Sequence, residues 1–233
     1  MWGKKTVAVV IFEESDVSFD VVEDYDSTGY VDEVIIVGDK KGKTNNSKKI
    51  LTRAKYLFQK NAGYANAIKE AINSTKADLI IVTEENGSFR GKDILKLLSY
   101  SGDFDVVLGS RTHLPLIHKG SGMTFSRRVF DDLFGKMISL VFASSPLTDV
   151  GCTLRLTNRK AWLRIKNVCS SIDDFFVCEW LIALASKKVK FIEIPVHFVA
   201  SRRKSREHTF FDLLKRALKV IFYVFKFRFG FNV

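Results

Sequence analysis

The chain has 233 residues, of which 46% are hydrophobic and 27% charged, and a formal net charge of +11 at neutral pH. These proportions are typical of one folded domain with an ample core, with or without a terminal appendage, and exclude a disordered chain. The excess of positive charge indicates partners of negative charge, namely phosphorylated substrates, nucleic acid or an anionic membrane, unless the surface is simply basic.

The first part of the chain alternates predicted strands and helices. Continuous apolar, β-branched runs at residues 6–12 and 31–37 predict strands buried on both faces. A short helix is predicted between them, at residues 15–25. Apolar residues with helical spacing then predict a second helix at residues 61–74.

Three further strands are predicted at residues 77–83, 104–109 and 191–198, and Pro195 places the last one at a sheet edge or strand end. Strands that alternate with helices predict an α/β fold with a mainly parallel sheet. In such sheets ligands bind beyond the carboxyl ends of the strands. Polar residues follow three of the predicted strands at that place: Asp39, Glu84 to Asn86, and Arg111.

The cysteines and histidines indicate neither a disulfide framework nor a zinc site. Cys152, Cys169 and Cys178 form no C-x-x-C pair and leave an odd one, which fits a reducing cytosolic compartment. The four histidines are too scattered for metal-ligand spacing. Because residues 1–5 run directly into the first predicted strand, we expect no signal peptide.

The segment 148–155 carries the strongest chemical signal. Asp149 and Arg155 flank Gly151 and Thr153. An arginine binds phosphate through its bidentate fork, and an aspartate orients or deprotonates a nucleophile, so the pair suits a phosphorylated acceptor. The plainer interpretation is an ion pair in which Arg155 braces Asp149.

The end of the chain is basic and rich in phenylalanine. A charged stretch at residues 199–207 separates it from the α/β body, so we divide the chain into 1–207 and 208–233. Spanning a bilayer takes about 20 largely apolar residues, and here lysines and arginines interrupt the run. The pattern predicts a basic amphipathic helix in a membrane interface. The alternative is a helix that packs on the protein's own core or on a dimer partner. The apolar side chains expected on one face are Phe210, Phe211, Leu214, Ala217, Leu218, Ile221, Phe222 and Phe225, with Asp212, Lys215, Arg216 and Lys219 on the other.

Several segments in this order resemble one family. They are EVIIVGD (33–39), GYANAIKEA (63–71), ADLIIVTEENGSF (77–89), DVVLGSR (105–111), the 149–155 run, an acidic helix at 176–182, IEIPVH (192–197) and the basic 202–206. Together they resemble a family-2 glycosyltransferase of the dolichol-phosphate mannosyltransferase type, with a GT-A fold. The chain departs from that family where Gly38 replaces the first of two aspartates and where Glu84, Glu85 and Asn86 replace the metal-binding D-x-D.

The resemblance implies a set of site residues. Catalysis falls to Asp149 and Arg155, and a Mg²⁺ or Mn²⁺ ion to Glu84 and Asn86. The residues implied in donor binding are Asp39, Glu84, Asn86, Arg111, Arg202 and Lys204. Those implied in binding the acceptor phosphate are Arg127, Arg128 and Ser205.

The implied activity is inverting transfer of a hexose from GDP-mannose or UDP-glucose to a polyprenyl or dolichyl phosphate. The protein would then be peripheral on the cytoplasmic face of a membrane with an anionic surface. Two alternatives stay open: a transferase to a glycan or lipid hydroxyl, with Asp149 as an essential base, and a catalytically silent GT-A domain that regulates or scaffolds a partner. We expect no nucleic-acid partner, because that interpretation rests on charge alone.

Overall fold

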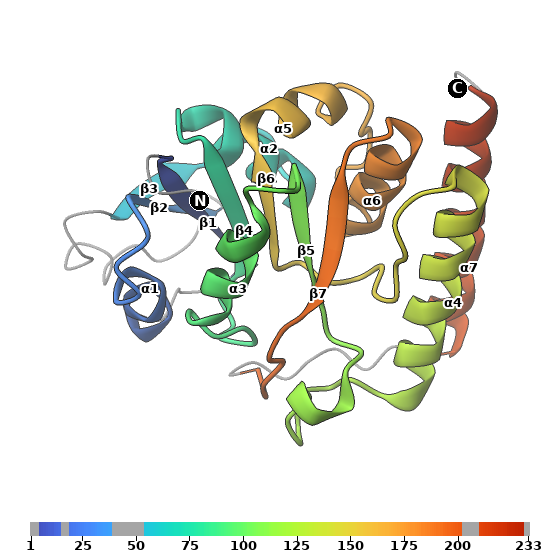
Figure 1. The fold of residues 1–233 in the computed structure, drawn as a ribbon, viewed down its shortest axis with the longest axis horizontal. Coiled ribbons are helices and arrows are strands. Elements are labelled where there is room, and N and C mark those ends of the chain that lie inside the picture. The colour runs from blue at the N-terminus through green and yellow to red at the C-terminus, as the bar shows by residue number, and fades with distance from the viewer. Residues whose placement is uncertain (1–4, 15–18, 39–53, 202–209, 231–233) are drawn as a thin grey trace.

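The structure is a computed structural model, and it describes residues 5–14, 19–38, 54–201 and 210–230. Its centre is a seven-stranded sheet in the order β3-β2-β1-β4-β6-β5-β7 (Figure 1). The strands are β1 (Val7–Glu13), β2 (Glu33–Gly38), β3 (Ala54–Phe58), β4 (Leu79–Glu84), β5 (Val106–Ser110), β6 (Arg155–Asn158) and β7 (Phe191–Pro195). All pairings are parallel except those of β6, which runs antiparallel to β4 and β5.

Helices cover both faces of the sheet. They are α1 (Phe19–Asp26), α2 (Tyr64–Ser74), α3 (Asp93–Tyr100), α4 (Phe125–Phe142), α5 (Arg159–Ile165), α6 (Phe176–Ser186) and α7 (Phe210–Phe229), with a short 3-10 helix, η2 (Leu114–Leu116). Successive strand residues point to opposite faces, so Val9 packs with α1 and α3 while Val10 packs with α2, α5 and α6. Both faces of the sheet are therefore buried, as the continuous apolar runs predict.

The α/β fold with a mainly parallel sheet is confirmed. The strands predicted at 6–12, 31–37, 77–83 and 104–109 correspond to β1, β2, β4 and β5, and Pro195 ends the edge strand β7. The described part of the helix predicted at 15–25 begins at residue 19, because residues 15–18 lie outside the described range. The sequence did not predict β3 or β6.

Two glycines set close contacts between elements near the carboxyl edge of the sheet. Gly63 precedes α2 at a φ of 116°, and a Cβ there would lie 2.5 Å from the carbonyl oxygen of Ile172. Gly135 lies within α4, where a Cβ would meet the carbonyl oxygen of Leu147 at 2.6 Å. Only glycine permits these approaches, so α4 lies directly against the segment that leads to Asp149.

The C-terminal helix α7 packs on α4 and α6 rather than standing apart. Val220 and Val224 belong to the buried core, and the Tyr223 hydroxyl lies 3.3 Å from the hydroxyl of Ser171. The alternative in which the helix packs on the protein's own core is therefore correct for one side of α7. Among the described residues, no helix is long and apolar enough to cross a membrane.

Candidate functional site

A cleft of about 310 Å³ opens at the carboxyl ends of β1 and β4. Parallel strands bring their carboxyl ends to one edge, and β6 begins at that edge because it runs the opposite way. The turn after β4 and the segment before β6 therefore face the same space. The polar lining from these two segments is Glu84, Glu85, Asn86 and Thr153.

Glu84 is held in place by hydrogen bonds at both carboxylate oxygens. Oε1 accepts from the Thr153 hydroxyl at 2.7 Å, and Oε2 accepts from the Asn86 amide at 2.7 Å. The Asn86 carbonyl oxygen accepts from the Ser88 amide at 2.9 Å, so Asn86 braces Glu84 within a tight turn. Each carboxylate oxygen keeps a further lone pair, which fits one hard cation that takes its other ligands from a diphosphate.

Two arginines line the same cleft, one from α4 and one from α7. In the described part of the chain, the Arg127 guanidinium has no side-chain hydrogen bond and no close ion pair. The nearby charge of Arg111, followed by burial, lowers the pKa of Arg127 to about 10. Arg216 lies 3.9 Å from Asp174, and its Nε is buried with no hydrogen-bond partner in the described structure. An anion entering the cleft would therefore meet guanidinium groups with unused donors.

Below Arg127 lies a buried pair formed by Arg111 and Asp149. Asp149 accepts four hydrogen bonds, from Nε, Nη2 and the backbone amide of Arg111 at 2.7 to 2.8 Å and from the Gly151 amide at 3.0 Å. Burial works to raise the pKa of Asp149, but Arg111 outweighs it and holds the pKa below its usual range. Nη2 of Arg111 also lies 3.4 Å from Asp131 of α4. The pair joins α4, the end of β5 and the approach to β6.

Several solved structures have a fold similar to that of this chain. Glucosyl-3-phosphoglycerate synthase from Mycobacterium tuberculosis, in complex with Mg²⁺ and UDP, matches with a TM-score of 0.73 and 10% identity over 100% of this chain and 82% of that one. The same synthase with Mn²⁺, UDP and glucosyl-3-phosphoglycerate matches at 0.70 and 12%, with the same coverage. CMP:2-keto-3-deoxy-manno-octonic acid synthetase with CTP matches at 0.53 and 14%, over 93% of this chain and 99% of that one.

The chain has the GT-A fold. At these identities the likeness establishes the fold alone. No protein-family model matches the sequence, and none of the curated proteins matches it. The GT-A fold expected from the sequence motifs is confirmed, whereas the dolichol-phosphate mannosyltransferase type remains a proposal.

Within this GT-A fold, Arg111 and Arg155 differ from their expected positions. Arg111 was expected at the donor phosphates, but its side chain is buried against Asp149. Arg155 was expected beside Asp149, yet it donates to the carbonyl oxygens of Cys152 at 2.5 Å and Val177 at 3.1 Å. The alternative in which Arg155 braces Asp149 is corrected: Arg111, which follows β5, occupies that place, because β5 ends beside the approach to β6.

The other residues expected to bind phosphate do not lie in one site. Arg128 lines a second cavity of about 290 Å³ with Thr112, His113 and Thr148, whereas its neighbour Arg127 faces the cleft. Consecutive residues of a helix point in different directions, so the two arginines serve different spaces. Four expected ligands lie outside the described residues: Asp39, Arg202, Lys204 and Ser205.

The cleft also contains residues that sequence reasoning missed. Phe12 and Tyr64 line it as an edge-to-face pair with ring centroids 4.8 Å apart. Tyr64 is the first residue of α2 and follows Gly63, and this glycine is the signal that could have indicated it. Asp174 lies in the turn before α6 and Arg216 lies on α7, and only the packing of α7 brings Arg216 to the cleft.

Glu193 of β7 gives this GT-A fold a measurable pH dependence. Its Oε2 accepts from the amide and hydroxyl of Thr148 at 2.6 and 3.1 Å, while Oε1 is buried with no partner in the described residues. Burial, followed by the charge of Asp149, raises the pKa of Glu193 from 4.5 to about 8. The folded state therefore holds a proton that the unfolded state releases, and stability falls as the pH rises between these values.

We expect Glu193→Gln to weaken this dependence, because glutamine keeps the hydrogen-bond acceptor without the charge. Melting temperatures of both proteins across pH 5 to 9 give the comparison. The wild type should lose more stability than the variant towards pH 9. Parallel curves would show that Glu193 titrates near its ordinary pKa.

Proposed function

We propose that this protein is an inverting glycosyltransferase that moves a hexose from a nucleotide sugar to a polyprenyl or dolichyl phosphate at a membrane surface. One observation carries the proposal: a braced carboxylate, Glu84, and two guanidinium groups with unused donors, Arg127 and Arg216, line one cleft at the ligand-binding edge of a GT-A fold. These groups match a donor diphosphate and an acceptor phosphate.

The neighbouring structures support a nucleotide-sugar donor. The synthase from M. tuberculosis is described in complex with UDP-glucose, Mn²⁺ and phosphoglyceric acid, and its acceptor therefore also carries a phosphate. In our chain, the aromatic pair of Phe12 and Tyr64 offers a surface against which a nucleobase would stack. GDP-mannose and UDP-glucose remain the first donors to test.

The reaction would be a single in-line displacement. An acceptor phosphate oxygen attacks the anomeric carbon, the bond from that carbon to the donor phosphate breaks, and the nucleoside diphosphate leaves with the bonding electrons. Arg127 and Arg216 would stabilise the phosphate charge by bidentate hydrogen bonds. A divalent cation, when bound at Glu84 with Asn86 beside it, would neutralise charge on the leaving diphosphate.

Asp149 has a positioning role in this proposal. A phosphate monoester is anionic at neutral pH, so the attack requires no strong base. Asp149 is buried under four hydrogen bonds and holds Arg111 and the Gly151 amide in place beneath the cleft. A hydroxyl acceptor would need a free base, and this carboxylate is not free in the structure.

Transfer from labelled nucleotide sugars tests the proposal, with a short polyprenyl phosphate, 3-phosphoglycerate or a glycan as acceptor. We expect product on the lipid phosphate, loss of turnover with EDTA, and a fall of about a hundredfold or more for Glu84→Gln. The matched control is Glu70→Gln, which should keep full activity. Glu70 lies outside the cleft, where its carboxylate accepts a hydrogen bond from the Lys60 backbone amide.

Each other outcome contradicts a defined part of the proposal. Product on 3-phosphoglycerate alone would replace the lipid acceptor with a soluble phosphorylated acid. Product on the glycan alone would favour the hydroxyl acceptor. Binding of nucleoside diphosphate without transfer from any donor would identify a catalytically silent domain.

A further inference from the structure

The outer side of α7 exposes a stripe of large apolar side chains. They recur with the three- and four-residue spacing of one helix face, and each is about half exposed or more: Leu214, Leu218, Phe222 and Phe225. The opposite side of α7 holds Val220 and Val224 in the core. The helix therefore has a second apolar side that folding of the described chain leaves in contact with solvent.

α4 repeats this arrangement. Phe134 and Ile138 point into the core, while the other side of the helix exposes apolar side chains. The exposed residues are Phe125 at 75%, Val129 at 49%, Leu133 at 60% and Leu140 at 81%. Two neighbouring helices thus share the same division into a buried and an exposed apolar side.

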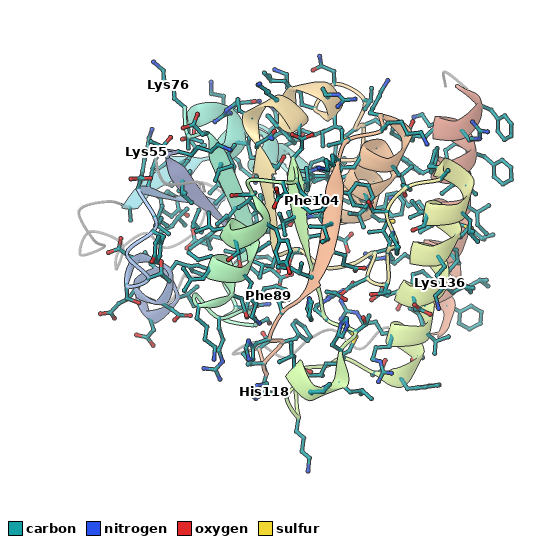
Figure 2. All side chains as sticks on the ribbon, in the orientation of Figure 1. Lys55, Lys76, Phe89, Phe104, His118 and Lys136 are labelled. Carbon is teal, nitrogen blue, oxygen red and sulfur yellow. The ribbon has the colours of Figure 1, made fainter. Side chains whose placement is uncertain are left out.

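The two stripes belong to one end of the molecule. α4 and α7 pack against each other and lie side by side beyond β7, away from α1 and α3 (Figure 1). Lys136 marks the outer side of α4 (Figure 2). We name these eight exposed apolar residues the α4–α7 face. Large apolar side chains that gather on the exposed sides of two neighbouring helices mark an interaction site.

Basic residues on the same helices indicate what the face contacts. Lys215, Lys219 and Lys226 follow one another along α7 beside its apolar stripe, and Lys136 is 64% exposed on α4. Lys219 and Lys136 form ion pairs with Asp173 and Asp132 that are exposed enough to exchange for lipid headgroups. Their long stems can lie along apolar surface while the ammonium groups reach a polar layer. A helix with an apolar side and flanking lysines binds in the interface of an anionic bilayer.

Charge also favours a bilayer over a second copy of the chain as the partner of this face. A two-fold contact through the α4–α7 face would bring identical patches together, and so would place their bordering lysines near one another. The net charge of +11 opposes such a contact. Anionic lipid headgroups instead complement both the apolar stripe and its basic border.

We propose that the α4–α7 face docks on an anionic lipid bilayer, with both helices lying in the interface. The inference deepens the proposed function and takes its significance from it, because the inner sides of the same helices bear Arg127 and Arg216. Docking would therefore hold the cleft beside the headgroups, where a lipid-linked phosphate is presented. In the described chain, both helices contribute to docking, beyond the C-terminal segment that the sequence indicates.

Vesicle co-sedimentation tests the docking face without any sugar donor. We compare phosphatidylcholine vesicles with vesicles in which part of the lipid is phosphatidylglycerol. Binding should require the anionic lipid and weaken with salt. Phe222→Glu on α7 and Leu133→Glu on α4 should each reduce the partition coefficient by about tenfold or more, because each removes one inserted side chain and adds a charge.

The matched control is Leu163→Glu on α5, whose side chain is 53% exposed outside the α4–α7 face. It should bind as the wild type does, and circular dichroism should show all variants folded. Unchanged binding of Leu133→Glu would overturn the role of α4. A dimer in light scattering that Leu133→Glu dissociates, with no vesicle binding, would assign the face to a second copy. Transfer without vesicle binding would overturn this inference alone, and vesicle binding without transfer would overturn only the proposed function.

Discussion

Replacing Asp149 by alanine is expected to lower the free energy of unfolding by about 3 to 5 kcal/mol. The substitution leaves the buried guanidinium of Arg111 without its main partner and removes the acceptor for the Gly151 amide. Asp131, whose carboxylate lies 3.4 Å from Arg111, would compensate only in part. Urea denaturation followed by circular dichroism measures the change.

Asp132→Ala is the matched control, because Asp132 forms an exposed ion pair with Lys136 at 2.7 Å. Exposed pairs contribute about 1 kcal/mol or less, so this variant should remain close to the wild type. Asp149→Asn should be intermediate, since it keeps an acceptor but loses the charge. Equal, small effects of all three variants would contradict a structural role for the Arg111–Asp149 pair.

The second large effect is expected at Arg127. Arg127→Ala should weaken binding of a nucleoside diphosphate or inorganic pyrophosphate by about tenfold to a hundredfold, because charge-assisted hydrogen bonds contribute about 1.5 to 3 kcal/mol. Its side chain has no partner to lose in the described structure, and its neighbour Arg111 carries the same charge. Stability should therefore change little, or rise. Isothermal titration calorimetry and thermal melting measure the two quantities.

The adjacent residue provides a close control for this prediction. Arg128 is on the same turn of α4 but lines the second cavity, so Arg128→Ala should leave pyrophosphate binding nearly unchanged. Arg127→Lys should recover only part of the affinity, because a lysine cannot form the bidentate fork. If Arg128→Ala weakens binding as much as Arg127→Ala does, the ligand lies between the two cavities rather than in the cleft.

The strands that the sequence predicts are those whose own residues form a continuous apolar run. The β-branched runs of β1, β2 and β4 predict buried strands, because helices cover both faces of a parallel sheet. β3 is a partly exposed edge strand with a weak pattern. β6 is short and begins with Arg155, a charged residue that a strand pattern does not predict. It is buried because its guanidinium donates to the Val177 carbonyl oxygen and lies over the Trp180 ring.

The site residues divide in the same way. The turn at Glu84 was indicated by its position after a predicted strand, and the segment at Asp149 by its aspartate and arginine around a glycine and a threonine. Both lie at the ligand-binding edge of the sheet. The sequence did not indicate Arg111 as the partner of Asp149, because Arg111 reaches Asp149 only through the packing of β5 beside β6. Arg216 was assigned to the polar side of a surface helix. Only the docking of α7 on α4 and α6 turns that side towards the cleft.

The close approach at Gly135 links the two sides of α4. With no side chain at this position, the helix backbone rests on the chain at Leu147 and Thr148, immediately before Asp149. There is no compressible layer between them, so a force on the outer surface of α4 is transmitted rather than absorbed. If α4 docks on a bilayer as proposed, the segment that leads to Asp149 would therefore move together with the helix.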